Sequence, residues 1–237
     1  MIEEDGRIKS YVAGFDEKLD GGIPNGHIVL ICGEPGTMKS SLAFSILYNN
    51  ALKEDKVGAF LSLEQGRKSL LKQMKGMGMD PQNIEDKLSI VDLSLIRKNL
   101  EALKNQTWVE IFKMYASNLK KNTDFVLFAV DSLSILETLA RFEYPREELF
   151  QLFEWLRDLG VTSLIISEMI IGEKAFGRYG EDFIADGIIH VKMENVDDVT
   201  VQRRIRCVKM RGTSHSPNYY TLLFEGGVFQ ATRVISD

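Results

Sequence analysis

The stretch "GEPGTMKS", residues 33–40, differs at one position from the pattern G-x-x-x-x-G-K-[ST], because Met38 stands where the pattern has its second glycine. It follows the apolar run "HIVLIC" (27–32) and precedes "SLAFSILYNNALKE" (41–54), in which apolar residues recur at helical spacing. The sequence therefore predicts a buried strand, a tight loop and a helix in that order. A purely structural turn between a strand and a helix is the alternative.

Such a strand, loop and helix would direct backbone N–H groups of the loop and the positive end of the helix toward phosphate oxygens. In this pattern Lys39 reaches the β- and γ-phosphates of a nucleotide, and the Ser40 hydroxyl binds Mg²⁺. A side chain at position 38 keeps the main-chain N–H donor but adds bulk. We therefore expect ATP and Mg²⁺ to bind at Gly33, Pro35, Gly36, Thr37, Met38, Lys39, Ser40 and Ser41.

Short β-branched runs alternate along the chain with longer segments of helical period, which is typical of an α/β protein with a mostly parallel sheet flanked by helices. Strands are expected at 27–32, 57–63, 125–130 and 162–167, and helices at 41–54, 69–78, 100–122 and 146–160. After about residue 182, four closely spaced strand-like runs predict an antiparallel β extension. No internal repeat or linker is visible, so we expect a single domain over residues 1–237.

Two carboxylates follow predicted strands and would emerge at the carboxyl edge of the sheet, where parallel sheets bind ligands. Asp131 ends the run "FVLFAVDS" and could hold Mg²⁺ through water, or could only cap the next helix. Glu64 ends "AFLSLEQG" and could act as the general base that activates water, although a single acid at a strand end is weak support.

The net charge of the 237-residue chain is -5, which gives no global attraction to nucleic acid or to an anionic membrane. No apolar run approaches the ~20 residues that span a bilayer. Cys32 and Cys207 lie in apolar stretches without metal-ligand spacing and are interpreted as free thiols of a reducing compartment. We therefore expect a cytoplasmic protein for which nucleic acid is an improbable partner and a membrane is excluded.

The chain resembles the RecA superfamily, and within it the KaiC-like ATPases, over nearly its whole length. The resemblance is carried by an entry segment, a strand with a catalytic glutamate, a Walker B strand end, a helix with its following strand, and two C-terminal signatures. These are "GFDEKLDGGIPNGHIVLICGEPG" (14–36), "FLSLEQ" (60–65), "VDSLS" (130–134), "ELFQLFEWLRDLGVTSLIISE" (148–168), "GRYGEDFIADGII" (177–189) and "VKMRGTSHS" (208–216).

The resemblance implies a RecA-like P-loop NTPase fold and a homo-oligomeric ring, in which a lysine and an arginine of one subunit contact the γ-phosphate bound by its neighbour. Carried over, the nucleotide contacts include Lys209, Met210, Arg211, Thr213 and His215. Lys39, Glu64, Lys209 and Arg211 then form the catalytic set, because cations supplied by a neighbour stabilise charge on the transferring phosphoryl group. A hexamer with an unidentified regulatory protein partner is the expected assembly.

The chain also departs from this family. It holds one ATPase module, Gln65 replaces a second acid, and the segment that the clock protein phosphorylates has no match, so clock activity and autophosphorylation are not implied. Arg203 and Arg204 are interpreted as the solvated face of a hairpin. Trp108, Phe112 and Tyr115 are interpreted as core residues rather than a partner surface.

Three functions remain open at this point. The first is a slow Mg²⁺-dependent ATPase that assembles as a ring and acts as a regulatory switch. The second is a recombinase-like ATPase that binds DNA, which the basic hairpin supports and the acidic net charge opposes. The third is an interaction module that binds nucleotide without hydrolysing it, for which Met38 and Gln65 would be the signs of a degenerate site.

Overall fold

Strand β3 (Ile28–Gly33) lies inside a sheet of nine strands, and all six of its residues are buried because the sheet is covered on both faces. The computed structural model describes residues 6–94, 107–172 and 174–234. The strand order is β11-β10-β9-β8-β3-β7-β6-β4-β5. The other strands are β4 (Gly58–Ser62), β5 (Leu88–Asp92), β6 (Leu127–Asp131), β7 (Thr162–Glu168), β8 (Gly187–Asn195), β9 (Val201–Met210), β10 (Tyr220–Glu225) and β11 (Val228–Arg233).

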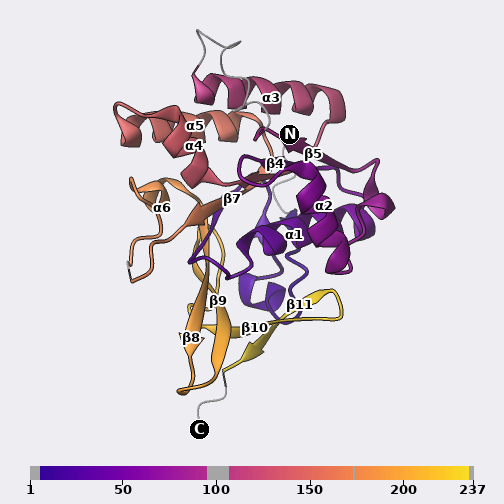
Figure 1. The fold of residues 1–237 in the computed structure, drawn as a ribbon, viewed down its shortest axis with the longest axis vertical. Helices are drawn as coiled ribbons and strands as arrows, with labels where there is room; N and C mark the ends of the chain where they lie inside the picture. Colours follow the sequence, from indigo (N-terminus) through magenta and orange to yellow (C-terminus); the bar gives the residue numbers. More distant parts are fainter. Residues whose placement is uncertain (1–5, 95–106, 173, 235–237) are drawn as a thin grey trace.

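Strands β3 to β8 run parallel to one another in this sheet, whereas the pairs β8–β9, β9–β10 and β10–β11 are antiparallel. In Figure 1 the hairpin of β8 and β9 extends away from the helical end of the molecule. A separate small ladder joins β1 (Arg7–Ile8) to β2 (Ile23–Pro24). This arrangement confirms the predicted α/β fold with an antiparallel C-terminal extension.

Two apolar clusters cover the two faces of the sheet, and side chains of β3 alternate between them as the two-residue period of a strand requires. Val29 and Ile31 pack on the face covered by α1 (Lys39–Lys53) and α2 (Arg67–Gly76). The opposite face packs against α3 (Trp108–Thr123), α4 (Leu133–Ala140) and α5 (Pro145–Asp158), which Figure 1 shows gathered together. Shorter turns are η1 (Asp16–Leu19), η2 (Pro81–Ile84) and α6 (Glu181–Ile184).

The residues at the N-termini of α3 and α5 explain where these helices begin. A capping box starts α3, since the Thr107 side chain accepts from the backbone of Glu110 and the Glu110 side chain accepts from the backbone of Thr107. Helix α5 begins with Pro145 in its first turn, where a missing N–H costs nothing. Residues 100–106 of the helix that the sequence predicts over 100–122 lie outside the described residues.

Trp108 and Phe112 are buried, as expected for core residues, whereas Tyr115 is 38% exposed. Strand β5 and helix α4 were not expected from the sequence. Among the described residues, no helix is both long and apolar enough to cross a membrane.

Candidate functional site

The loop between β3 and α1 is held by hydrogen bonds from its own side chains to its backbone. The Thr37 hydroxyl donates to the Glu34 carbonyl oxygen at 2.8 Å, and the Lys39 ammonium donates to the same oxygen at 2.9 Å. Thr37 is fully buried, so it supports the loop from within rather than facing a ligand. The loop and the first turn of α1 open onto a cleft of about 590 Å³.

Met38 adopts the left-handed backbone conformation, with φ 71° and ψ 28°, at the residue that precedes α1. A residue with a Cβ atom is strained in this conformation, whereas glycine adopts it freely. The chain therefore keeps the loop shape that glycine would favour. The Met38 side chain is partly buried against the apolar cluster on the α1 face and also lines the cleft.

Three carboxylates from three strands line the cleft. Asp131 is the last residue of β6, Glu64 lies two residues beyond β4, and Glu168 is the last residue of β7. The structure therefore brings Asp131 and Glu64 to the phosphate loop, where the sequence analysis expected them. Glu168 was not among the residues expected from the sequence, although it carries the same signal as the other two, an acid at the end of a buried strand.

Asp131 is 2% exposed, and burial raises the pKa of its carboxyl to about 6, while a hydrogen bond from Ser40 opposes that rise. Its Oδ1 atom is buried without a hydrogen-bond partner among the described residues. The cap of α4 is Ser132, whose side chain accepts from the Ile135 N–H, so capping does not explain Asp131. A buried carboxylate oxygen without a partner beside a serine hydroxyl fits a hard cation such as Mg²⁺.

Lys39 carries the main positive charge at the start of α1. Burial lowers the pKa of its ammonium, and the neighbouring carboxylates of Glu168, Asp131 and Glu64 oppose that shift. Three carboxylates therefore surround one lysine, and a bound divalent cation would offset this excess of negative charge. Ser41 is buried, and Gln73 donates to its hydroxyl at 3.4 Å.

Arg203 corrects the interpretation of the hairpin. Its side chain lines the cleft, and its Nε atom donates to the Gly36 carbonyl oxygen at 3.4 Å. Arg204 is also not solvated, because it is 5% exposed and pairs with Glu194 at 3.3 Å. The two-residue strand period could have separated them, since Arg203 shares a face with the core residue Ile205 and Arg204 points the other way.

Lys209 and Arg211 lie toward the amino-terminal end of strand β3, whereas the phosphate loop follows its carboxyl-terminal end. The Arg211 backbone N–H donates to the Asp186 carbonyl oxygen, and the Asp186 backbone N–H donates to the carbonyl oxygen of Ile28, the first residue of β3. The loop begins at Gly33, the last residue of that strand, which puts the Arg211 backbone ~16 Å from the loop along the strand direction, at about 3.3 Å per residue. Within one chain, neither cation lines the cleft.

Both cations are held by α6 and its neighbourhood. The Lys209 ammonium donates to the carbonyl oxygens of Asp182, Phe183 and Ala185 at 3.0, 3.3 and 2.6 Å. The Arg211 guanidinium donates to Asp186 at 2.7 Å and to the Phe183 carbonyl oxygen at 3.1 Å.

The other expected nucleotide contacts near this edge also lie outside the cleft. Met210 is buried in the apolar cluster on the α1 face. The Thr213 hydroxyl accepts from Arg7 at 3.1 Å. The His215 Nδ1 atom is buried without a hydrogen-bond partner in the described part of the chain.

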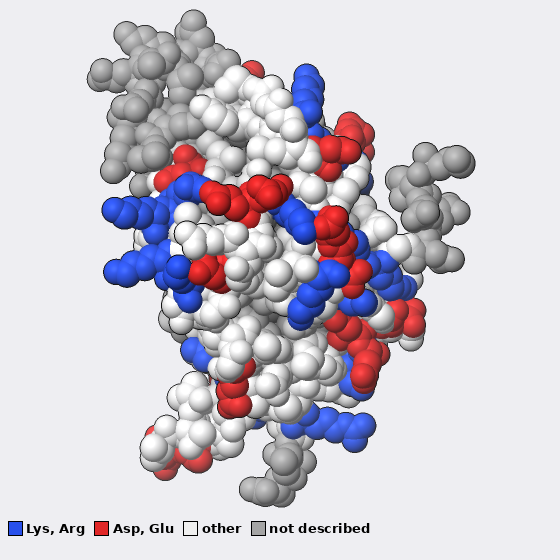
Figure 2. Space-filling view, turned by 90° about the vertical axis from the view of Figure 1, so that its right-hand side faces the viewer, with Lys and Arg blue, Asp and Glu red and all other residues white. Residues whose placement is uncertain are grey.

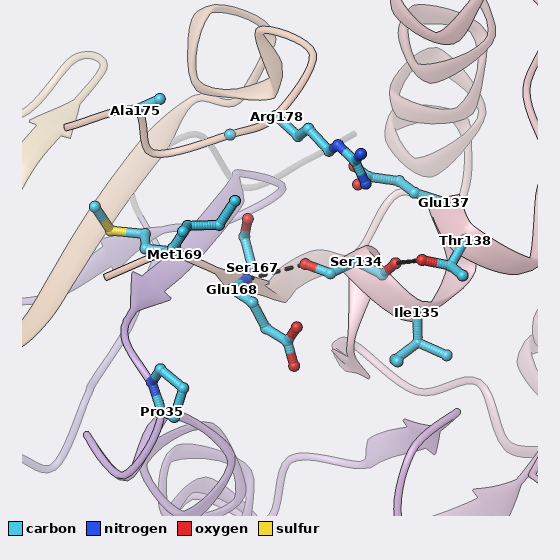
Figure 3. A pocket seen from close by; sticks show the side chains of 12 residues that line it. Pro35, Ser134, Ile135, Glu137, Thr138, Ser167, Glu168, Met169, Ala175 and Arg178 are labelled. Atoms are coloured by element: carbon cyan, nitrogen blue, oxygen red, sulfur yellow. Dashed lines mark hydrogen bonds between the residues drawn. The ribbon is translucent and has the colours of Figure 1, made fainter. Parts of the chain in front are cut away.

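A second cavity, of about 300 Å³, adjoins the cleft and shares Pro35 and Glu168 with it (Figure 3). Glu137 of α4 lines it and is 8% exposed. Burial, a hydrogen bond with Glu181 and the charge of Glu181 raise the pKa of Glu137 to about 9. Glu181 is itself buried and accepts from the Tyr179 N–H at 2.8 Å. The signature over 177–189 contains Glu181, but no sequence motif pointed to Glu137.

The family model of the KaiC ATPase matches residues 8–228. A UPF0273 protein of Sulfurisphaera tokodaii is 33% identical over 218 residues, covering 89% of this chain and 76% of the relative. The circadian clock protein KaiC2 of Synechocystis is 32% identical over 226 residues, covering 90% of this chain but only 38% of the relative.

Among solved structures, the KaiC-like protein PH0186 of Pyrococcus horikoshii has a TM-score of 0.81 and 29% identity, covering 95% of this chain and 98% of that one. That solved structure therefore shares the fold of this chain over nearly its whole length. The chain therefore belongs to the KaiC family of RecA-like, ATP-binding P-loop NTPases.

Proposed function

We propose that this chain hydrolyses ATP to ADP and phosphate slowly, in a Mg²⁺-dependent reaction, within a homo-oligomeric ring whose active sites lie at subunit interfaces. Residues 1–237 would form one ATPase domain, and the ring, a hexamer in this proposal, would act as a regulatory switch for a protein partner. The separation of the Lys39 cleft from Lys209 and Arg211 carries this proposal. A site that needs both sets of cations can be completed only by a second copy.

Each proposed site combines residues of one chain with residues of a neighbouring copy. The backbone of the loop and Lys39 bind the phosphates, and Ser40 and Asp131 would hold Mg²⁺, which supplies charge neutralisation of the phosphates when bound. Glu64 is exposed at the rim of the cleft and would accept a proton from the attacking water. Lys209 and Arg211 of the neighbouring copy would stabilise the charge on the γ-phosphate, with Thr213 and His215 close to the nucleotide.

DNA binding receives less support from the structure than from the sequence. The basic hairpin was the argument for it, but Arg203 lies in the cleft and Arg204 is buried against Glu194. On the face that Figure 2 shows, basic and acidic side chains lie interspersed, which is unlike a continuous basic track for a phosphate backbone.

One experiment tests the proposal. The mass of the protein in solution is measured with and without Mg·ATP, and phosphate release is assayed in the same samples. The proposal expects a multimer that turns over ATP, loss of nucleotide binding in Lys39→Ala, and retained binding without turnover in Glu64→Gln. A chain that remains a monomer with ATP would refute the shared site, and tight binding without any turnover would favour a non-hydrolysing module.

A further inference from the structure

Glu168 lies beside the first residue of the phosphate loop. Strand β7 is the direct neighbour of β3, and the register pairs Glu168 with Gly33. The N–H of the next residue, Met169, donates to the Gly33 carbonyl oxygen at 3.0 Å, which fixes this pairing. In Figure 3 the Glu168 side chain lies between Pro35 of the loop and Ser134 and Ile135 of α4. This carboxylate therefore comes from the strand adjacent to the loop, closer in the sheet than the strand of Asp131.

Glu168 and Asp131 project from the same face of the sheet. The register places Val130 beside Ile165, so Asp131 is level with Ile166, and Glu168 follows two residues later on the same face. Ile166, Asp131 and Glu168 all line the cleft. Two acids thus converge on the space in front of the loop, although the phosphate-loop motif and the Walker B strand account for only one of them.

The backbone of Glu168 is held while its side chain remains accessible. Its N–H donates to the Ser134 hydroxyl of α4 at 3.0 Å, and the residue itself is exposed. Glu168, Asp131, Glu64 and Lys39 all line the cleft, and the charge of Glu168 opposes the lowering of the Lys39 pKa more than the charges of the other two acids do. Glu168 is therefore placed to interact with the lysine that the motif assigns to the phosphates.

We propose that Glu168 is a positioning residue that attracts the Lys39 ammonium in the cleft and competes with the γ-phosphate for it. This inference rests on the proposed ATP site. A carboxylate at this place repels each phosphate group, and repulsion falls with distance, so the phosphate that lies against Lys39 is affected most. The site would then bind ATP without metal poorly and would depend on Mg²⁺ to screen the two like charges.

The expected effect appears in nucleotide discrimination rather than in stability. Glu168→Gln removes the charge and keeps the shape, so ATP should bind about tenfold more tightly without Mg²⁺, and ADP should gain less, about threefold. Added Mg²⁺ should reduce both gains. Glu168→Asp keeps the charge and should retain the wild-type ratio of ATP to ADP affinity.

Titration of a fluorescent ATP and a fluorescent ADP, each with and without Mg²⁺, tests this in wild type and both variants. Glu85→Gln is the matched control. Glu85 is an exposed acid that precedes the start of β5, whereas the cleft lies at the carboxyl ends of the strands. An ATP to ADP ratio in Glu168→Gln equal to that of Glu85→Gln would overturn the inference and leave the proposed function standing. A wild-type chain that binds neither nucleotide would overturn both.

Discussion

Replacing Met38 with glycine and, separately, with alanine tests the conformation that the phosphate loop imposes on this position. Met38 has φ 71°, a backbone conformation that costs a residue with a Cβ atom about 1–2 kcal/mol. Its side chain is partly buried against the apolar cluster on the α1 face, so both substitutions lose about 1 kcal/mol of packing. The two variants share this loss and differ in the backbone term.

Glycine relieves the strain but increases the entropy of the unfolded chain, which offsets about 0.5–1 kcal/mol of the gain. Met38→Gly should therefore stay within about 1 kcal/mol of the wild-type free energy of unfolding. Met38→Ala keeps the strain and should be less stable than Met38→Gly by about 1 kcal/mol. In a chain of this size, that difference corresponds to about 2–4 °C in Tm.

Urea denaturation of the two variants and the wild type, followed by circular dichroism, measures these differences. The order of the variants is informative because alanine is the more favourable residue at ordinary helical positions. An alanine variant as stable as the glycine variant, or more stable, would refute the left-handed conformation. Nucleotide titration of the same samples should show that Met38→Gly still binds ATP, since the N–H donor is unchanged.

Three further predictions concern the cleft and the buried titratable groups. Arg203→Gln should weaken ATP binding about tenfold in a nucleotide titration, because the guanidinium lines the cleft; unchanged affinity would place Arg203 outside the site. The folded pKa of Glu137, about 9, lies above the unfolded value of 4.5, so the folded state holds the extra proton between these values and its stability falls as pH rises through them. Glu137→Gln should flatten that slope in urea denaturation at pH 6 and pH 8, and an equal slope would contradict the raised pKa of Glu137. The pKa of His190 is lowered from 6.5 to about 4 by burial and then by Arg206 and Lys192, so the stability that neutral His190 supports is present above pH 6.5 and is lost as pH falls toward 4. His190→Asn should show a smaller loss between pH 6.5 and pH 4.5 than wild type does.

The sequence predicted the central strands because they are buried on both faces and therefore read as continuous apolar runs. Strand β5 was missed because it lies at the sheet edge, where only Leu88 of its five residues is buried. Helix α4 was missed because its eight residues are too few for a helical period to stand out.

The candidate site was predictable where chain order fixes position. Asp131 and Glu64 follow strands, and parallel strands end at one edge, so their approach to the loop follows from the pattern. Arg203 could not be placed in that way, because its position depends on β9 lying beside β8 and on the register of that pair. The same register places Lys209 away from Lys39, and this separation could not be predicted from the residues that neighbour either lysine in the sequence.

The opposed placement of the Lys39 cleft and the Lys209–Arg211 edge makes the molecule directional. Copies that join the cleft of one to the cation edge of the next form head-to-tail contacts, and an open row leaves one unfinished cleft at its end, whereas a closed ring leaves none. The effects of a substitution in the cleft and of one at the Lys209–Arg211 edge can then be separated. In the proposed ring, a copy without Lys39 would lose its own site but could still complete that of its neighbour, so two inactive variants, one altered at each end, would regain activity when mixed.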